Sequence, residues 1–392
     1  MAEVKFEPVL FIAWGDRENM LGPHFETAGQ QALMMAPGKR LRPLPVILRL
    51  DANNGIHILD GAGSAILSFS FNGDFSRKTN TGVTANATVI DFLPGSNWYI
   101  LLYRMDNGQY VVRKTDDTGA VLWTTPVAQE NVSPGKIVLA NGKIFISSQS
   151  DPHTLFEMAA GNGNTFDKKQ LEQPMARPFG ITSGEIISAT YFPDLQRRGI
   201  AIYEPATGTE SKTVCAKELY GPLSSAIGAD DEKNCYLFSS NATNSAHGLL
   251  KIDTTGHILN QINFPMFSTG KDHELITITT DGNQLKIVRS ASPGKEQTVQ
   301  VSEEMREYLP GRMNIVGLEQ DQLVIDLLGK QGGFEKRVLA GPDGKWIKEM
   351  PVAEETVIAH VPSYVNWAVS GNGMLYFPFC NEHGIMVIKT KI

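Results

Sequence analysis

Hydrophobic and polar residues alternate along this chain in short runs, and many runs end at a turn rich in Asp, Thr and Gly. The clearest case is 110–123, where apolar positions alternate on both sides of an Asp-Thr-Gly turn at 117–119. A second copy spans 249–259. A period of two is typical of a strand with one buried face, and glycine accepts the positive φ of a tight turn. The phrase therefore predicts a β-hairpin whose turn Asp caps its own backbone.

The hairpin phrase recurs at a regular spacing. Seven turn glycines, from Gly63 to Gly344, are on average about 47 residues apart, which is in the range of four-stranded propeller blades. Two further strand-like runs precede a typical hairpin, as 88–92 and 98–103 do before Gly119. Four strands per unit, arranged radially, make a blade. The sequence therefore predicts an all-β fold, a β-propeller of four-stranded antiparallel blades.

The number of blades depends on how the chain ends meet. The last unit has three inner-type runs, at 365–369, 374–377 and 385–389, and it lacks a fourth strand. The N-terminal run 9–14 is apolar and has no unit of its own. Pairing it with the C-terminal strand would close the ring and remove exposed edges. We favour eight blades. Seven is the alternative, with the region before about residue 60 as an extra arm.

No Pro-, Ser- or Gly-rich linker divides the sequence. We therefore expect a single β-propeller domain over 1–392. Within it, 1–14 is a candidate ring-closing strand, and 15–43 is an irregular or helical N-terminal segment.

Composition and charge exclude several classes of protein. The chain is 42% hydrophobic and 20% charged, as globular domains are. Its net charge is −7 and it has no basic stripe, so a nucleic-acid partner is not expected. The three cysteines, Cys215, Cys235 and Cys380, do not have the spacing of a disulfide framework or a zinc site. Neither a signal peptide nor an apolar run of about 20 residues is present, so we expect a cytoplasmic protein without membrane insertion.

The turn and strand at 117–123 resemble the repeat of quinoprotein-like (PQQ-type) propellers, in which an Asp-x-x-Thr-Gly turn leads into a strand that carries a tryptophan. The resemblance implies that Trp123 packs between neighbouring blades. Gly208 and Gly256 are not followed by tryptophan at that place, and the adjacent-cysteine pair of the alcohol-oxidising members is missing. The resemblance therefore implies the fold class and no bound quinone.

The sequence contains none of the following common catalytic motifs. It has no Gly-x-Ser-x-Gly elbow, no His-Glu-x-x-His pair and no phosphate-binding loop. The run 51–55 begins like a calcium loop, but its ligand spacing breaks at Gly55, so a β-turn is predicted there. We therefore predict no catalytic residue, no bound metal and no cofactor.

Loops that join second to third strands should lie on one face of a propeller. These loops supply our candidate binding residues, which are Asp151, His153, Arg197, Arg198, His247, Glu382 and His383. Imidazole can bind a metal or exchange a proton near neutral pH. The alternative is that polar residues collect in exposed loops for solvation alone.

Three functions remain open at this level. We favour a non-enzymatic scaffold that binds protein partners within a larger assembly, because catalytic signals are sparse. The second is a hydrolase or lyase that acts on a small molecule at the channel mouth with His153, His247 or His383. The third is a quinone-dependent oxidoreductase. The sequence identifies neither the partner nor the oligomeric state.

Overall fold

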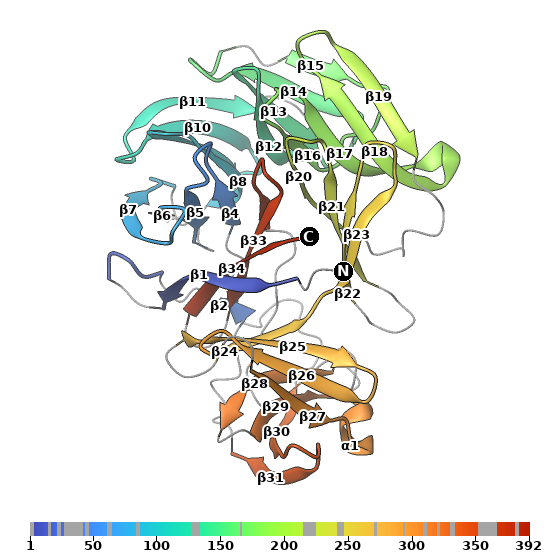
Figure 1. Ribbon diagram of the computed structural model, residues 1–392. Helices are drawn as coiled ribbons and strands as arrows, with labels where there is room; N and C mark the ends of the chain where they lie inside the picture. Colours follow the sequence, from blue (N-terminus) through green and yellow to red (C-terminus); the bar gives the residue numbers. More distant parts are fainter. Residues whose placement is uncertain are drawn as a thin grey trace.

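The structure is a computed structural model that describes residues 4–14, 17–21, 25–26, 42–43, 47–60, 65–83, 87–127, 134–164, 167–214, 225–240, 247–269, 273–292, 295–308, 312–319, 322–329, 334–351, 367–380 and 384–392. They form eight four-stranded antiparallel sheets, as predicted (Figure 1). The chain is a β-propeller.

We number the sheets 1 to 8 along the chain. Sheet 1 consists of β4 (Ile47–Leu50), β5 (Ile56–Leu59), β6 (Ala65–Phe69) and β7 (Phe75–Asn80), and sheet 2 of β8 (Ala87–Pro94), β9 (Trp98–Met105), β10 (Tyr110–Asp116) and β11 (Val121–Val127). Sheet 3 consists of β12 (Pro134–Ala140), β13 (Lys143–Ser148), β14 (Thr154–Ala159) and β15 (Asp167–Gln170). Sheet 4 consists of β16 (Pro178–Gly180), β17 (Ile186–Phe192), β18 (Arg197–Glu204) and β19 (Thr209–Val214). A short 3-10 helix, η1 (Pro193–Leu195), joins β17 to β18.

Sheet 5 consists of β20 (Ser225–Ala229), β21 (Cys235–Ser240), β22 (His247–Ile252) and β23 (Ile258–Asn263). Sheet 6 consists of β24 (Met266–Thr269), β25 (Leu275–Asp281), β26 (Gln284–Arg289) and β27 (Glu296–Gln300). Sheet 7 consists of β28 (Met313–Glu319), β29 (Gln322–Leu328), β30 (Phe334–Ala340) and β31 (Trp346–Met350). Helix α1 (Glu303–Arg306) lies between sheets 6 and 7 in the sequence. Sheet 8 combines β32 (Ala368–Val369), β33 (Met374–Cys380) and β34 (Gly384–Lys391) with β1 (Phe6–Ala13).

The N-terminal strand completes sheet 8, as predicted. β1 pairs with β34 in antiparallel register, from Phe6 opposite Thr390 to Ala13 opposite Gly384. The Thr390 hydroxyl adds a hydrogen bond of 2.8 Å to the carbonyl of Lys5. Most of the predicted irregular segment 15–43 lies outside the described residues. Its described parts include a two-residue pairing of β2 (Phe25–Glu26) with β3 (Arg42–Pro43).

The inner strands of six sheets follow one another around the centre of the molecule. Each of these strands contacts the next, in the order β4, β8, β12, β16, β20 and β32, and β32 contacts β4 again. At the junction of sheets 5 and 8, the backbone N–H of Asp231 donates to the carbonyl of Gly371 at 2.9 Å. Sheets 6 and 7 pack on each other through β24 and β28, and β25 contacts β1 (Figure 1, lower part). All eight sheets are blade-like, but six of them enclose the centre. A single domain over the whole chain stays a prediction.

Strand burial depends on position within the sheet. In β9, the second strand of sheet 2, the residues Tyr99–Tyr103 are all buried, whereas the outer strand β23 alternates between half-buried and exposed residues. The middle of β9 is covered on both faces by neighbouring sheets, so its sequence is a continuous apolar run. Outer strands keep one face in water and show the expected period of two.

The repeated turn has the predicted hairpin form, but a different aspartate caps it. The Asp116 carboxylate accepts hydrogen bonds from the N–H groups of Thr118 and Ala120, both at 2.9 Å, and from the Thr118 hydroxyl at 2.7 Å. Asp253 makes the same three bonds in the second copy. The capping residue therefore lies three positions before the glycine, because from there its carboxylate reaches the N–H groups two and four residues later.

Trp123 packs between two sheets, as the family resemblance implies. A Cβ built on Gly163 of sheet 3 would lie 2.7 Å from the Trp123 ring. The ring also packs against the apolar cluster that sheets 2 and 3 share. Trp123 is therefore a structural residue.

Candidate functional site

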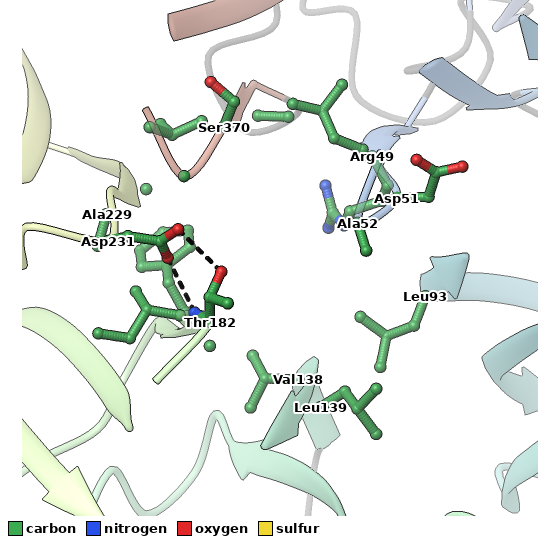
Figure 2. A pocket seen from close by; sticks show the side chains of 18 of the residues that line it. Arg49, Asp51, Ala52, Leu93, Val138, Leu139, Thr182, Ala229, Asp231 and Ser370 are labelled. Carbon is green, nitrogen blue, oxygen red and sulfur yellow. Dashed lines mark hydrogen bonds between the residues drawn. The ribbon is translucent and has the colours of Figure 1, made fainter. Parts of the chain in front are cut away.

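A pocket of about 470 Å³ occupies the centre of the six-sheet circuit (Figure 2). Residues of β4, β8, β12, β16, β20 and β32, or of the turns that follow them, line it. One wall is apolar and includes Leu93, Val138 and Leu139. Leu139 is 37% exposed although it belongs to an inner strand. The centre of the molecule therefore holds a cavity, and part of its apolar wall is exposed to solvent.

A buried carboxylate joins three of the lining sheets. Asp91 on β8 is 2% exposed and forms an ion pair with Arg49 on β4. It also accepts hydrogen bonds from the N–H groups of Phe92 at 2.9 Å and of Ile137 on β12 at 3.1 Å. A bulge between Val89 and Asp91 shifts the register of β8 at this point, and bulges re-aim side chains in this way. The charge of Asp91 is therefore fully engaged by protein groups.

Lys136 is the second cation of the pocket. Its ammonium lies 3.5 Å from the centre of the Phe179 ring, in cation–π contact. Removal from water and the nearby positive charge of Arg49 lower the pKa of Lys136 well below its usual value, with Asp91 opposing and Arg177 adding to the effect. No carboxylate of the described residues lies within ion-pair distance of this ammonium.

Two aspartates lie in the turns at one end of the pocket. Asp231 accepts from the N–H and the hydroxyl of Thr182, each at 2.9 Å, and this pair joins sheets 5 and 4 (Figure 2). Asp51 accepts from the N–H groups of Asn53 and Gly55, both at 2.8 Å. The β-turn predicted at 51–55 is thereby confirmed. Both aspartates shape turns and already have protein partners.

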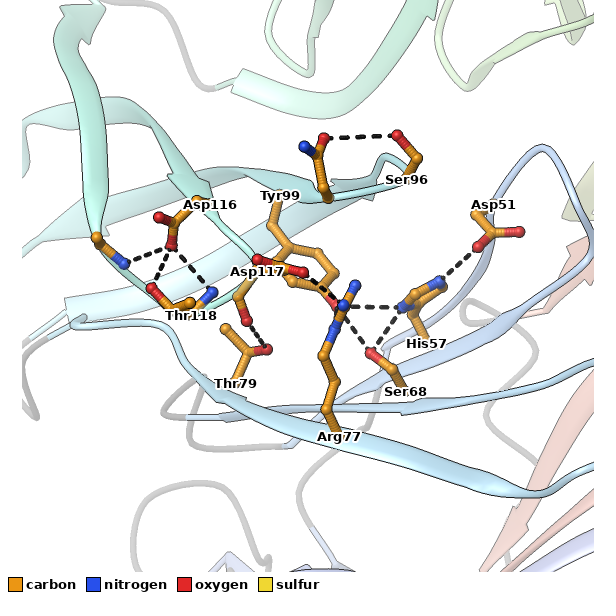
Figure 3. Close-up of polar contacts among 12 residues, drawn as sticks. Asp51, His57, Ser68, Arg77, Thr79, Ser96, Tyr99, Asp116, Asp117 and Thr118 are labelled. Carbon is orange, nitrogen blue, oxygen red and sulfur yellow. Dashed lines mark hydrogen bonds and ion pairs between the residues drawn. The ribbon is translucent and has the colours of Figure 1, made fainter.

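Asp51 also begins a buried chain of hydrogen bonds (Figure 3). His57 Nε2 lies 3.2 Å from Asp51, its Nδ1 lies 2.9 Å from the Ser68 hydroxyl, and that hydroxyl lies 2.7 Å from the Tyr99 hydroxyl. The hydrogen bond to His57 is the largest of the effects that lower the pKa of Asp51 to about 2.

The order Asp–His–Ser resembles a hydrolase triad, but the surroundings do not fit one. Ser68 and His57 are 3% and 4% exposed, and Tyr99 on sheet 2 is fully buried. A nucleophile must reach its substrate, and this serine lies inside the wall between sheets 1 and 2. This series of hydrogen bonds is therefore a structural link between two sheets. Sequence reasoning missed it because the partners are 6 to 42 residues apart and no motif links them.

Two of the residues predicted to form a binding face lie together in one turn of sheet 3. Asp151 and His153 form the β13–β14 turn, where the Thr154 hydroxyl donates to Asp151 at 2.6 Å. This hydrogen bond is the main cause that lowers the Asp151 pKa. His153 Nδ1 lies 3.2 Å from the carbonyl of Leu171.

The other predicted residues divide into two groups. Arg197 and Arg198 begin β18. His247 begins β22, and its side chain lies outside the description, as do Glu382 and His383 entirely. The four predicted residues at 151, 153, 197 and 198 are absent from the pocket lining. Their binding role stays a prediction.

The described part of the chain holds no group of three His, Cys, Asp or Glu side chains suited to a metal ion. Cys235 is a buried thiol, as its apolar strand predicts. The helical segments that the structure describes, η1 and α1, are too short to cross a bilayer.

Comparison with known proteins gives likeness of fold at low identity. Hydrazine synthase of Kuenenia stuttgartiensis matches with a TM-score of 0.45 and 9% identity, over 91% of this chain and 97% of that one. A chain of the mitotic checkpoint complex matches with a TM-score of 0.42 and 11% identity, over 94% and 96%. YCF48 bound to D1 peptide matches with a TM-score of 0.38 and 11% identity, over 75% and 95%. No protein-family model and no curated protein matches the sequence.

Proposed function

We propose that this propeller is a non-enzymatic scaffold that binds a protein partner within a larger assembly, and that the β17–β18 hairpin is part of its binding surface. The observation that carries the proposal is the tip of this hairpin. Tyr191 and Leu195 are 48% and 46% exposed there, and the neighbouring Arg197 is exposed as well. Two large apolar side chains and an arginine are therefore exposed at the tip of one hairpin.

The base of the hairpin is held in place, so the tip is presented in a defined form. Phe192 is 4% exposed and belongs to the core between sheets 3 and 4. It pairs across the hairpin with Arg197, and Gly199 leaves room for its ring. η1 forms the turn itself. A preordered loop loses little entropy on binding, which favours affinity.

The chemistry of the tip indicates the chemistry of the partner. Tyrosine and arginine are enriched among the residues that contribute most to protein interfaces. An apolar partner pocket bordered by carboxylates would receive Tyr191 and Leu195 and pair with Arg197. We therefore expect a protein partner with an acidic border around an apolar depression.

The experiment compares immobilised variants for retention of proteins from the host cell, quantified by mass spectrometry. A Tyr191→Ser/Leu195→Ser double variant and an Arg197→Glu variant should each retain a specific partner in an amount about tenfold lower, or less. Leu259→Ser on β23 is the matched control, because Leu259 is 53% exposed on another outer strand. Equal retention by all variants, with unchanged thermal unfolding, would refute the role of the hairpin.

A further inference from the structure

The central pocket contains a lysine, Lys136, that has no ion-pair partner among the described residues. Arg49 is paired with Asp91, whose remaining acceptor capacity is used by two backbone N–H groups. Asp51 and Asp231 bond to residues of their own turns or of the neighbouring sheet. Lys136 contacts the Phe179 ring and has no carboxylate of the described chain within 4.0 Å. When protonated, Lys136 therefore lacks an anionic partner within the described part of the chain.

Two side-chain donors of the lining residues also lack an acceptor in the described part of the chain. Arg49 Nε and Trp367 Nε1 are buried donors without a hydrogen-bond partner in the described part of the chain. Both residues belong to the pocket lining, together with Lys136. Buried donors are rarely left without an acceptor. Both nitrogens are closed off from solvent, so a ligand in the pocket would accept from them only if the lining shifted.

The size and shape of the pocket define the rest of the ligand. A volume of about 470 Å³ falls within the range of small-molecule sites and exceeds what a simple inorganic ion needs. From Lys136 to Leu139, β12 rises by about 10 Å, and Val138 and Leu93 continue the apolar wall. An anionic group at Lys136 would therefore be followed by an apolar body lying along this wall.

We propose that the central pocket binds a small organic anion, with one carboxylate or phosphate group of the anion at Lys136 and its apolar body against Leu93, Val138 and Leu139. The anion balances the ammonium in a site partly removed from water, where charge pairs are stronger than in bulk solvent. It would also oppose the lowering of the Lys136 pKa that removal from water causes. Phe179 remains in contact with the ammonium and limits its orientation.

This site is independent of the proposed protein-binding role. One end of the pocket is formed by turns between first and second strands, such as those at Asp51 and Asp231. The β17–β18 hairpin joins a second to a third strand, and in an antiparallel sheet those turns lie at the opposite ends of the strands. Failure of either proposal therefore leaves the other unaffected.

Calorimetric titration of the full chain with benzoate, phenyl phosphate and benzamide tests the charge requirement. The three probes share one ring and differ in the charged group, so benzamide is the neutral control. We expect saturable binding of benzoate or phenyl phosphate, with benzamide about tenfold weaker or more. The tighter of the two anions identifies the head group that the site prefers. Equal binding of benzamide, or no saturable binding of either anion at millimolar concentration, would overturn the proposal.

Two variants and one chemical measurement locate the site. Lys136→Met keeps an unbranched side chain beside Phe179 and should weaken anion binding by about tenfold or more. Lys345→Met is the control, because Lys345 is 80% exposed. In the unmodified protein, the bound anion should slow acetylation of Lys136 by acetic anhydride and leave acetylation of Lys345 unchanged, as measured by peptide mass spectrometry. This measurement decides the matter even if Lys136→Met fails to fold. Equal acetylation of Lys136 with and without the anion would place the ligand elsewhere and contradict the proposal.

Discussion

Gly119 of the repeated turn lies directly against the preceding sheet, and this contact can be tested by adding one methyl group. The φ of Gly119 is +93°, and a Cβ there would lie 2.3 Å from the carbonyl oxygen of Asn80 on β7. Gly208 occupies the corresponding turn of sheet 4 with a φ of +74° and has no atom within 4 Å of such a Cβ. Gly119→Ala and Gly208→Ala therefore share the backbone strain and differ in the collision.

The expected magnitudes follow from this difference. Alanine at positive φ costs about 1–2 kcal/mol, partly offset by about 0.4–1 kcal/mol of lost freedom in the unfolded chain. Gly208→Ala should therefore lower the free energy of unfolding by about 1 kcal/mol or less. Asn80 cannot easily move away, because β7 pairs it with Ala65 and the Thr79 hydroxyl donates to the Asp117 carbonyl at 2.7 Å. Overpacking adds about 1–3 kcal/mol, so Gly119→Ala should lose about 2–4 kcal/mol.

The assay is urea unfolding followed by tryptophan fluorescence, with midpoints compared at equal slope. Gly119→Ala should unfold at a clearly lower urea concentration than Gly208→Ala, which should stay close to the unmodified protein. Equal midpoints for the two variants would refute the reasoning, because they would show that the turn does not depend on its contact with the preceding sheet.

Three further predictions concern charges and ring closure. The pKa of Asp51 in the folded protein is about 2, below its ordinary value of 3.8, so its carboxylate stabilises the fold at higher pH, and this contribution, at most about 2 kcal/mol, is lost as pH falls from about 5 to 2. Asp51→Asn should flatten the acid side of the stability profile measured by thermal unfolding, whereas Asp167→Asn, at a position 70% exposed, should leave it unchanged. Asp91→Asn leaves Arg49 without its buried partner and should cost about 3–5 kcal/mol in urea unfolding, whereas Asp281→Asn, at a 66% exposed ion pair, should change stability by about 0.5 kcal/mol or less; similar losses would contradict the bridging role of Asp91. Deletion of residues 1–13 exposes the edge of β34 and should give aggregation or a lower melting temperature, measured by light scattering and calorimetry, with an added peptide of the β1 sequence restoring stability; a monomeric product of unchanged melting temperature would contradict ring closure by β1.

Much of the fold could be predicted because its units are local in sequence. Alternating apolar residues and glycine turns predicted the four-stranded units, and the spare N-terminal run predicted the closing strand that β1 provides. The capping aspartate was assigned one residue too late, because the sequence has two adjacent aspartates, Asp116 and Asp117, and only the geometry shows which one reaches the turn N–H groups.

The candidate site could not be predicted in the same way. Lys136 and Phe179 come from different sheets, and no sequence motif marks their contact. Arg49 and Asp91 are 42 residues apart, and Asp91 reaches Ile137 another 46 residues on. The loop residues predicted from histidine and arginine content lie on other turns, because composition shows which loops are polar and does not show which inner strands converge.

Sequence pattern was enough to predict the strand units and their order, because period and turn chemistry act between near neighbours, and the unpaired N-terminal run indicated the strand that completes sheet 8. Only the packing of the folded chain brings β20 against β32, so that six sheets enclose the pocket while sheets 6 and 7 pack on each other. That choice depends on how the side chains of whole sheets fit together, as at Gly228, which leaves space for Val369. Such fit is a property of surfaces brought together from distant parts of the chain, and no local pattern encodes it.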